Sequence, residues 1–132
     1  MKYLATARIV ASWILQCLGA FGFANIGIGK FRGTFWQQSF ARWGYPDGFY
    51  MVVGGAEFIG GLLLLVPKLS SYAALCLMGI MICASATHAL AGQTARIMAP
   101  VPWAVTMAVI AWLRWPSRAG ARRKANEIPA SV

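Results

Sequence analysis

Apolar residues in this chain gather into four long segments, separated by short polar or turn-forming stretches. The segments cover about residues 8–29, 48–66, 71–90 and 100–115. A helix needs roughly 20 apolar residues to cross a hydrocarbon core about 30 Å thick, and these segments approach that length. The pattern therefore predicts an all-α integral membrane protein, a four-helix bundle with short connections.

One face of the first span carries small and polar side chains. They recur every three or four residues: Ser12, Gln16, Gly19, Ala20, Phe23 and Gly27. Small residues let membrane helices approach closely, and polar residues form bonds between helices. We therefore expect this face to pack against the other spans. Arg8, at the start of the face, is expected to snorkel to a membrane surface.

The stretch between the first two spans, residues 31–43, is too polar to cross a membrane. Its aromatic residues lie on one side of a helical wheel and its polar residues mostly on the other. This pattern predicts an amphipathic helix that lies in the membrane interface. A turn follows at residues 45–48, in which Asp47 is placed to cap the second span.

The last two spans show weaker signals of how they pack. The third carries a seam of small residues at helical spacing, which is expected to face the bundle: Ala73, Cys76, Gly79, Cys83 and Ala86. Pro100 and Pro102 are expected to open the fourth span, because proline is tolerated in the first turn of a helix.

The distribution of charge suggests a topology. The chain has 12 Lys and Arg against 3 Asp and Glu, a net charge of +9. The basic residues lie between and beyond the spans, which indicates topology signals and anionic-lipid contacts rather than a nucleic-acid surface. Most of them fall on the side that carries both termini, so we expect both termini in the cytoplasm of a bacterial inner membrane. Residues 116–132 are expected to form a disordered basic cytoplasmic tail.

Glu57 is the one acidic residue near the middle of a span. A carboxylate at that depth costs several kcal/mol, so an intramembrane Glu is a functional hypothesis. Gln16 falls at a similar depth on the first span, as counted from the helix ends, and could share a hydrogen bond with Glu57. The pair could hold a quinol hydroxyl or relay a proton. Alternatively, it is a buried polar clasp that fixes the register of two helices.

Lys30 and His88 fall near the other ends of their spans. With Glu57 they could line a polar cavity in which Lys30 balances the carboxylate and His88 exchanges protons. The alternatives are a snorkelling lysine and a histidine hydrogen-bonded at the headgroups. We take Glu57, Gln16, Lys30 and His88 as the candidate ligand-binding residues, and the sequence assigns no catalytic residue.

The sequence gives little support for a resident metal or a thiol pair. A b-type haem takes two axial ligands, and the chain has one His. A haem shared with another subunit stays open. Cys76 and Cys83 lie about 10 Å apart on one helix, too far for a disulfide, so we expect them to pack as small apolar residues.

Several of these features together resemble the DoxX / DoxX-like family of small four-helix bacterial membrane proteins. The resemblance covers about residues 9–115 and rests on the order of its features. These are Gln16–Phe23, Gly29-Lys30-Phe31, Gly44-Tyr45-Pro46, Gly54–Gly61 followed by Leu62–Pro67, and Ala84–His88. It implies the fold and the membrane location. Since relatives resemble the membrane part of thiosulfate–quinone oxidoreductase or belong to redox-stress complexes, it also implies a link to quinone.

Three functions follow as hypotheses. The first is an accessory or quinone-interacting subunit of a membrane redox system, with a quinone as ligand and a redox protein or a second copy as partner. The second is a non-catalytic membrane adaptor that assembles partner proteins. The third is a small-molecule carrier, which would need a continuous polar lumen. Whether the chain is an enzyme stays open at this point.

Overall fold

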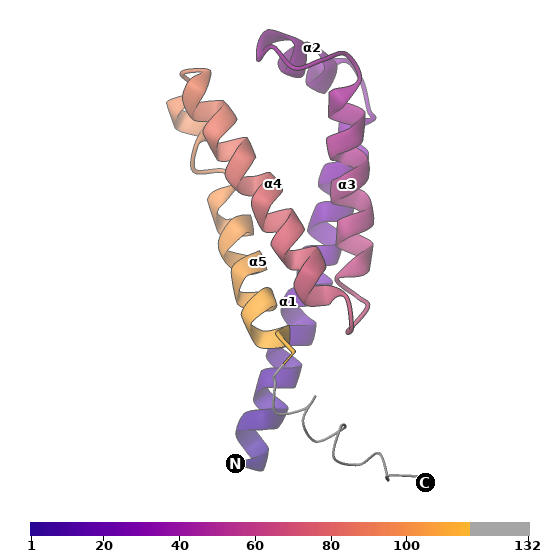
Figure 1. The fold of residues 1–132 in the computed structure, drawn as a ribbon, viewed down its shortest axis with the longest axis vertical. Coiled ribbons are helices and arrows are strands. Elements are labelled where there is room, and N and C mark those ends of the chain that lie inside the picture. The colour runs from indigo at the N-terminus through magenta and orange to yellow at the C-terminus, as the bar shows by residue number, and fades with distance from the viewer. Residues whose placement is uncertain (117–132) are drawn as a thin grey trace, which may run out of the picture.

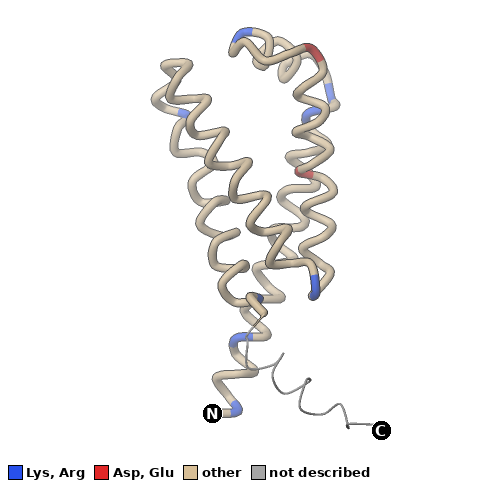
Figure 2. The backbone as a smooth tube through the Cα atoms, viewed as in Figure 1, with Lys and Arg blue, Asp and Glu red and all other residues tan. Residues whose placement is uncertain are grey.

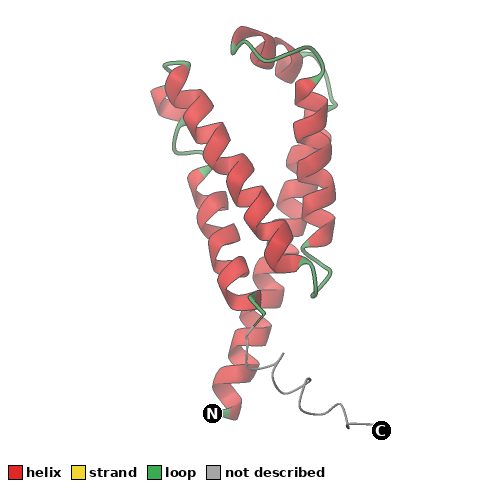
Figure 3. Cartoon of the chain, viewed as in Figure 1, coloured by secondary structure: helices red, strands yellow, loops and turns green. Residues whose placement is uncertain are grey.

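The computed structural model describes residues 1–116, and this part of the chain is helical with no strand (Figure 3). Its elements are α1 (Lys2–Lys30), α2 (Phe35–Arg42), α3 (Phe49–Leu63), α4 (Ser70–Leu90), the 3-10 helix η1 (Thr94–Arg96) and α5 (Val101–Arg114). Helices α1 and α4, and the stretch Thr94–Arg114, are long and apolar enough to cross a membrane, whereas α3 is apolar but shorter. The predicted all-α membrane bundle is confirmed.

The helices are arranged as two pairs. Helix α1 packs chiefly against α3, and α4 packs chiefly against α5. The pairs lie closest beside the turn between α3 and α4 and diverge toward the end of the molecule that carries α2 (Figure 1). We call this end the α2 end. The first turns of α1 extend beyond the other helices at the opposite end, which we call the terminal end (Figure 1).

The face predicted on the first span is the face that α1 buries. All six of its residues are buried, and Lys30 joins them at the end of the helix. Phe23 is fully enclosed and meets Trp103 of α5 edge to face, with ring centroids 5.3 Å apart. Leu64, Leu77, Met107 and Ile110 complete the centre of the core.

Helix α3 is shorter than the predicted span over residues 48–66. It ends at Leu63, and turns follow up to α4. Pro67 disfavours a helical conformation at the residue before it, which helps to end the helix early. Asp47 does not cap α3: the N-cap is Gly48, with a left-handed φ of 79°, and no side chain bonds to the first turn. The expected Asp47 cap is therefore wrong, because glycine supplies the turn by its backbone alone.

The small-residue seam predicted on the third span is also wrong, except at Ala73. Helix α4 buries Ala73, Ala74, Leu77 and Met81, whereas Cys76 and Cys83 are exposed, as is Cys17 on α1. The cysteines therefore do not pack in the interior. A helix that is apolar on every side gives no hydrophobic signal for its buried face, and here two alanines, Leu77 and Met81 face the core.

Helix α2 lies across the N-terminal end of α3 (Figure 1). Phe40 is its buried anchor, and its ring lies 5.3 Å from that of Tyr45 and 6.1 Å from that of Phe49, between centroids. The two expected prolines also have their predicted places, since Pro100 is the N-cap of α5 and Pro102 lies in its first turn.

Basic residues occur at both ends of the described chain, and its acidic residues, Asp47 and Glu57, lie in the half nearer the α2 end (Figure 2). Arg8 does not simply snorkel. Its guanidinium donates to the carbonyl oxygens of Leu113, at 2.8 Å, and Trp112, at 3.3 Å, and so caps the C-terminal end of α5. The predicted tail lies outside the described residues from residue 117 onward.

Candidate functional site

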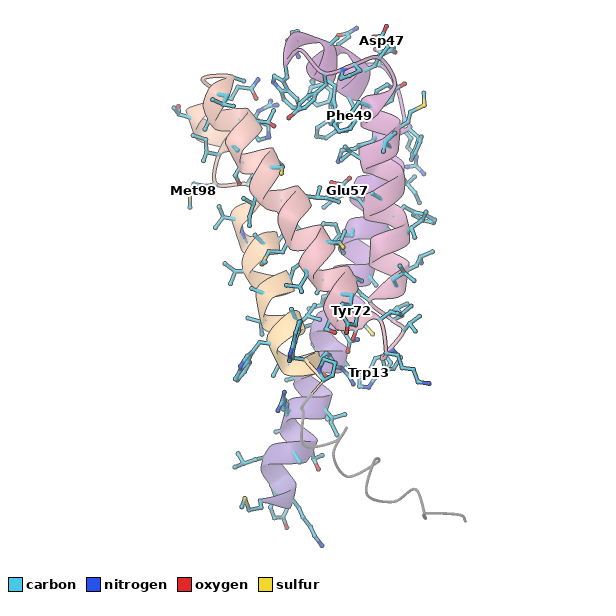
Figure 4. The ribbon with its side chains drawn as sticks, in the orientation of Figure 1. Trp13, Asp47, Phe49, Glu57, Tyr72 and Met98 are labelled. Atoms are coloured by element: carbon cyan, nitrogen blue, oxygen red, sulfur yellow. The ribbon has the colours of Figure 1, made fainter. Side chains whose placement is uncertain are left out.

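The candidate site is centred on an ion pair between α1 and α3. Lys30 Nζ donates to Glu57 Oε2 at 2.5 Å. The side chains are 6% and 2% exposed, so both charges are withdrawn from solvent and lipid. Figure 4 shows Glu57 about midway along α3, below Phe49 and Asp47. A buried pair of this kind offsets much of the cost of placing each charge alone in an apolar bundle.

Close contact between two glycines brings the ion pair together. A Cβ atom on Gly27 would lie 2.5 Å from the carbonyl oxygen of Gly54, and one on Gly54 would lie 2.9 Å from Lys30 Cβ. The backbones of α1 and α3 therefore touch one turn before Lys30. Because Glu57 follows Gly54 by three residues, it lies on the same face of α3 and meets the lysine.

Trp36 of α2 covers the lysine. Lys30 Nζ lies 4.6 Å from the centre of the Trp36 ring, within the range of a cation–π contact. Helix α2 thus supplies an aromatic wall to the buried pair. No sequence pattern distinguishes Trp36 from its aromatic neighbours, because its role depends on how α2 folds back over α1.

The pair keeps unused hydrogen-bonding capacity. Among the described residues, Lys30 is the hydrogen-bond partner of Glu57 and reaches it through Oε2, so no protein donor bonds Oε1. An ammonium group carries three N–H donors, of which Glu57 takes one. The site can therefore offer an acceptor and a donor side by side, next to an aromatic ring.

Gln16 does not take part in this site. Its Nε2 donates to the Leu64 carbonyl oxygen at 2.6 Å, and its Oε1 accepts from Arg114 Nε at 2.9 Å. The expected hydrogen bond between Gln16 and Glu57 is therefore wrong. Gln16 lies beside the last turn of α3, about two turns nearer the terminal end than Glu57, because α1 continues well past the point where α3 stops.

Gln16 instead links the middle of α1 to the C-terminal ends of α3 and α5, at the terminal end of the bundle. Arg114 stacks over the Trp13 ring at 5.1 Å, and its Nη2 is buried without a hydrogen-bond partner among the described residues. The role of Arg114 was missed from the sequence, where it serves as a topology signal. No periodic pattern links residues that are 98 positions apart.

His88 lies at the α2 end, away from the ion pair. Its Nδ1 donates to Gln93 Oε1 at 2.8 Å, and its ring meets Trp43 edge to face at 5.3 Å. Nearby, the Tyr45 hydroxyl lies 2.7 Å from Thr87 Oγ1. The structure thus brings Lys30 and Glu57 together, but it places His88 in a contact between α4 and the chain that follows α2.

No group of three His, Cys, Asp or Glu side chains within residues 1–116 is arranged to hold a metal ion.

Comparison with known proteins identifies one family: the DoxX-like family matches over residues 14–111, which is most of the chain. No curated protein and no solved structure matches the chain. The matched region contains α2, α3 and α4 entire, and with them both residues of the ion pair.

Proposed function

Since the chain belongs to the DoxX-like family, we propose that this membrane protein is an accessory, quinone-interacting subunit of a membrane redox system. The observation that supports the proposal is the buried Lys30–Glu57 pair, with one free carboxylate oxygen, beneath the Trp36 ring. In this proposal, the chain binds the head group and handles protons, while a partner protein carries the redox centre.

The chemistry of a quinone head group matches the capacity of this site. A quinol hydroxyl donates to Glu57 Oε1, and a quinone carbonyl oxygen accepts from Lys30 Nζ. The ring packs against Trp36, as flat aromatic systems do. When a quinol passes two electrons to the redox centre of the partner, it releases two protons. In this proposal Glu57 accepts the first proton, and the second passes to water at the α2 end.

The proposed orientation places both termini in the cytoplasm of a bacterial inner membrane. The terminal end carries Lys2, Arg8, Lys68 and Arg114, and four more basic residues follow in the tail. An excess of Lys and Arg marks the cytoplasmic side of short membrane proteins. The ion pair then lies nearer the periplasmic side, where the α2 end would meet a periplasmic redox partner.

The adaptor function is the competing proposal, and one observation favours it. The ion pair is almost fully enclosed, as expected of a clasp that fixes the register of α1 against α3. Helix α2 and the turn before it also expose Phe31 and Phe35, each about half accessible, at the α2 end of the molecule. In this alternative, the exposed surface of α2 binds a partner protein, and the Lys30–Glu57 ion pair is structural.

Mass spectrometry of the lipids that remain with the purified protein separates the two proposals. The quinone proposal expects native quinone with the wild-type protein and little with Lys30→Met/Glu57→Gln. This double variant removes both charges together, so no lone charge stays buried. Lys68→Met, at the exposed turn between α3 and α4, is the control for a lysine-to-methionine change away from the site.

The wild-type and variant proteins are compared only where both elute as single species of the same size from gel filtration. Equal quinone in the wild-type and double-variant proteins would contradict the role of the pair. Absence of quinone from wild-type protein, purified gently from quinone-rich membranes, would favour the adaptor.

A further inference from the structure

A second polar feature lies at the α2 end and plays no part in the proposed quinone site. It is a cavity of about 520 Å³ between α2 and the facing segment Gly92–Arg96, which follows α4 and includes η1. Its walls include Phe35 and Arg42 from α2, and Gln93, Thr94 and Arg96 from the facing segment. Neither Lys30 nor Glu57 lines it. The two walls come from the two different helix pairs, which diverge toward this end (Figure 1).

The charges around the cavity are all of one sign. Arg42 and Arg96 are its charged residues, and no Asp or Glu lines it. Within residues 1–116 the ion pair identified is Lys30–Glu57, so neither arginine has a carboxylate partner there. Arg42 and Arg96 are both exposed to solvent. Two guanidinium groups beside one open cavity repel each other, and together they attract an anion.

Both arginines are held in place by neighbours that leave hydrogen-bond donors free. The Arg96 guanidinium lies 6.0 Å from the centre of the Phe35 ring, and this contact joins the two walls of the cavity. Arg42 Nη2 bonds Ser39 Oγ at 3.3 Å, which occupies one of its five N–H donors. Gln93 uses its Oε1 on His88, so its amide N–H groups remain available, as does the Thr94 hydroxyl.

We infer that this cavity binds an oxyanion group, held between Arg42 and Arg96. Guanidinium groups match the oxygen geometry of phosphate and bind it by paired hydrogen bonds. The cavity is several times larger than a phosphate ion, so the oxyanion fills only the part of it that lies between the two guanidinium groups. The group belongs either to the head of an anionic phospholipid or to a free phosphate ion, since the cavity lies at the end of apolar helices. Binding there joins the two helix pairs at the end where they diverge.

The inference is tested by thermal unfolding of the protein purified in a neutral detergent. Inorganic phosphate is compared with chloride at equal ionic strength, and phosphatidylglycerol is compared with phosphatidylcholine in the micelles. A ligand that binds the folded state raises its unfolding temperature in proportion to its affinity. The wild-type protein is expected to respond to phosphate, to phosphatidylglycerol or to both. If inorganic phosphate raises the unfolding temperature, a free phosphate ion is enough to occupy the cavity. If only phosphatidylglycerol raises it, the ligand is the lipid headgroup.

Three arginine variants complete the test. Arg42→Gln and Arg96→Gln are each expected to weaken binding at least about tenfold, because each removes one of two charge-assisted contacts. Arg32→Gln is the matched control: Arg32 is an exposed arginine near the same end that does not line the cavity, and its loss should leave the response unchanged. Lys30→Met/Glu57→Gln should also keep the response, so failure of the quinone proposal would leave this inference standing.

Two results would overturn the inference. One is a wild-type protein that responds to phosphate no more than to chloride and to phosphatidylglycerol no more than to phosphatidylcholine. The other is a response that Arg42→Gln and Arg96→Gln retain at the strength seen for Arg32→Gln, which would place the anion elsewhere on the basic surface.

Discussion

Gly27 and Gly54 hold the backbones of α1 and α3 in direct contact, with room for no Cβ atom between them. Everything at the candidate site depends on this contact. The contact lies one turn from Lys30 and fixes the distance between the two helices there. As a result, the lysine side chain reaches Glu57 rather than the lipid headgroups.

The glycine contact predicts an unequal effect of two neighbouring substitutions. Gly54→Ala should destabilise the protein by about 1–3 kcal/mol, because the added methyl group would overlap Lys30 Cβ and the Gly27 carbonyl oxygen. Gly55→Ala meets nothing within 4 Å and should be neutral or slightly stabilising. Unfolding of both variants in a denaturing detergent measures the difference. Equal stability of the two variants would show that the helices do not touch at Gly54.

The ion pair predicts that two single substitutions do more harm than their combination. Lys30→Met and Glu57→Gln should each cost about 3–5 kcal/mol, because each leaves a charge buried with no partner. The double variant should recover a large part of that loss, since it buries no charge. The same unfolding measurement in a double-mutant cycle gives the coupling between the residues. Additive losses would mean that the two side chains do not interact.

Gln16 predicts a defect at the opposite end of the bundle. Gln16→Met keeps the volume but removes the bonds to the Leu64 carbonyl oxygen and to Arg114. Leaving these buried groups unpaired should cost about 1–3 kcal/mol. Asn25→Met is the control, because Asn25 is exposed and bonds only its own helix, at Phe21. Quinone content should stay at the wild-type level in both variants, since neither residue touches the ion pair.

Helix α4 offers a test of which of its faces is buried. Cys76→Leu should change stability by less than about 0.5 kcal/mol, since Cys76 is on the exposed face. Ala74→Leu, two residues earlier, should cost about 1–3 kcal/mol because Ala74 is fully buried in the core. The opposite order of the two effects would restore the small-residue seam as the packing face.

Much of the fold could be predicted from the sequence, because helix length and hydropathy depend on local composition. The buried face of α1 was also predictable, since Gln16 and its glycine neighbours differ sharply from the apolar residues around them. Helix α4 gave no such contrast. Lipid is as apolar as a protein core, so hydrophobicity does not tell the lipid-facing side from the packed side.

The site was predictable only in part. Glu57 and Lys30 were chosen because charges in an apolar segment need partners, and that reasoning is independent of the fold. The pairing of Gln16 failed for a geometric reason. Depth was counted from helix ends that were assumed to lie at one membrane surface, whereas α1 begins at Lys2 and extends past the end of α3. Trp36 and Arg114 act through contacts that only the folded chain creates.

The most direct test of the central claim is to locate a bound quinone with a photoreactive short-chain analogue. After illumination and peptide mapping, the account predicts cross-links to α2 around Trp36 and to the facing turns of α1 and α3, lost on addition of excess unlabelled quinone and in Lys30→Met/Glu57→Gln. Cross-links confined to lipid-facing positions such as Trp112, unaffected by competitor or by the double variant, would contradict it.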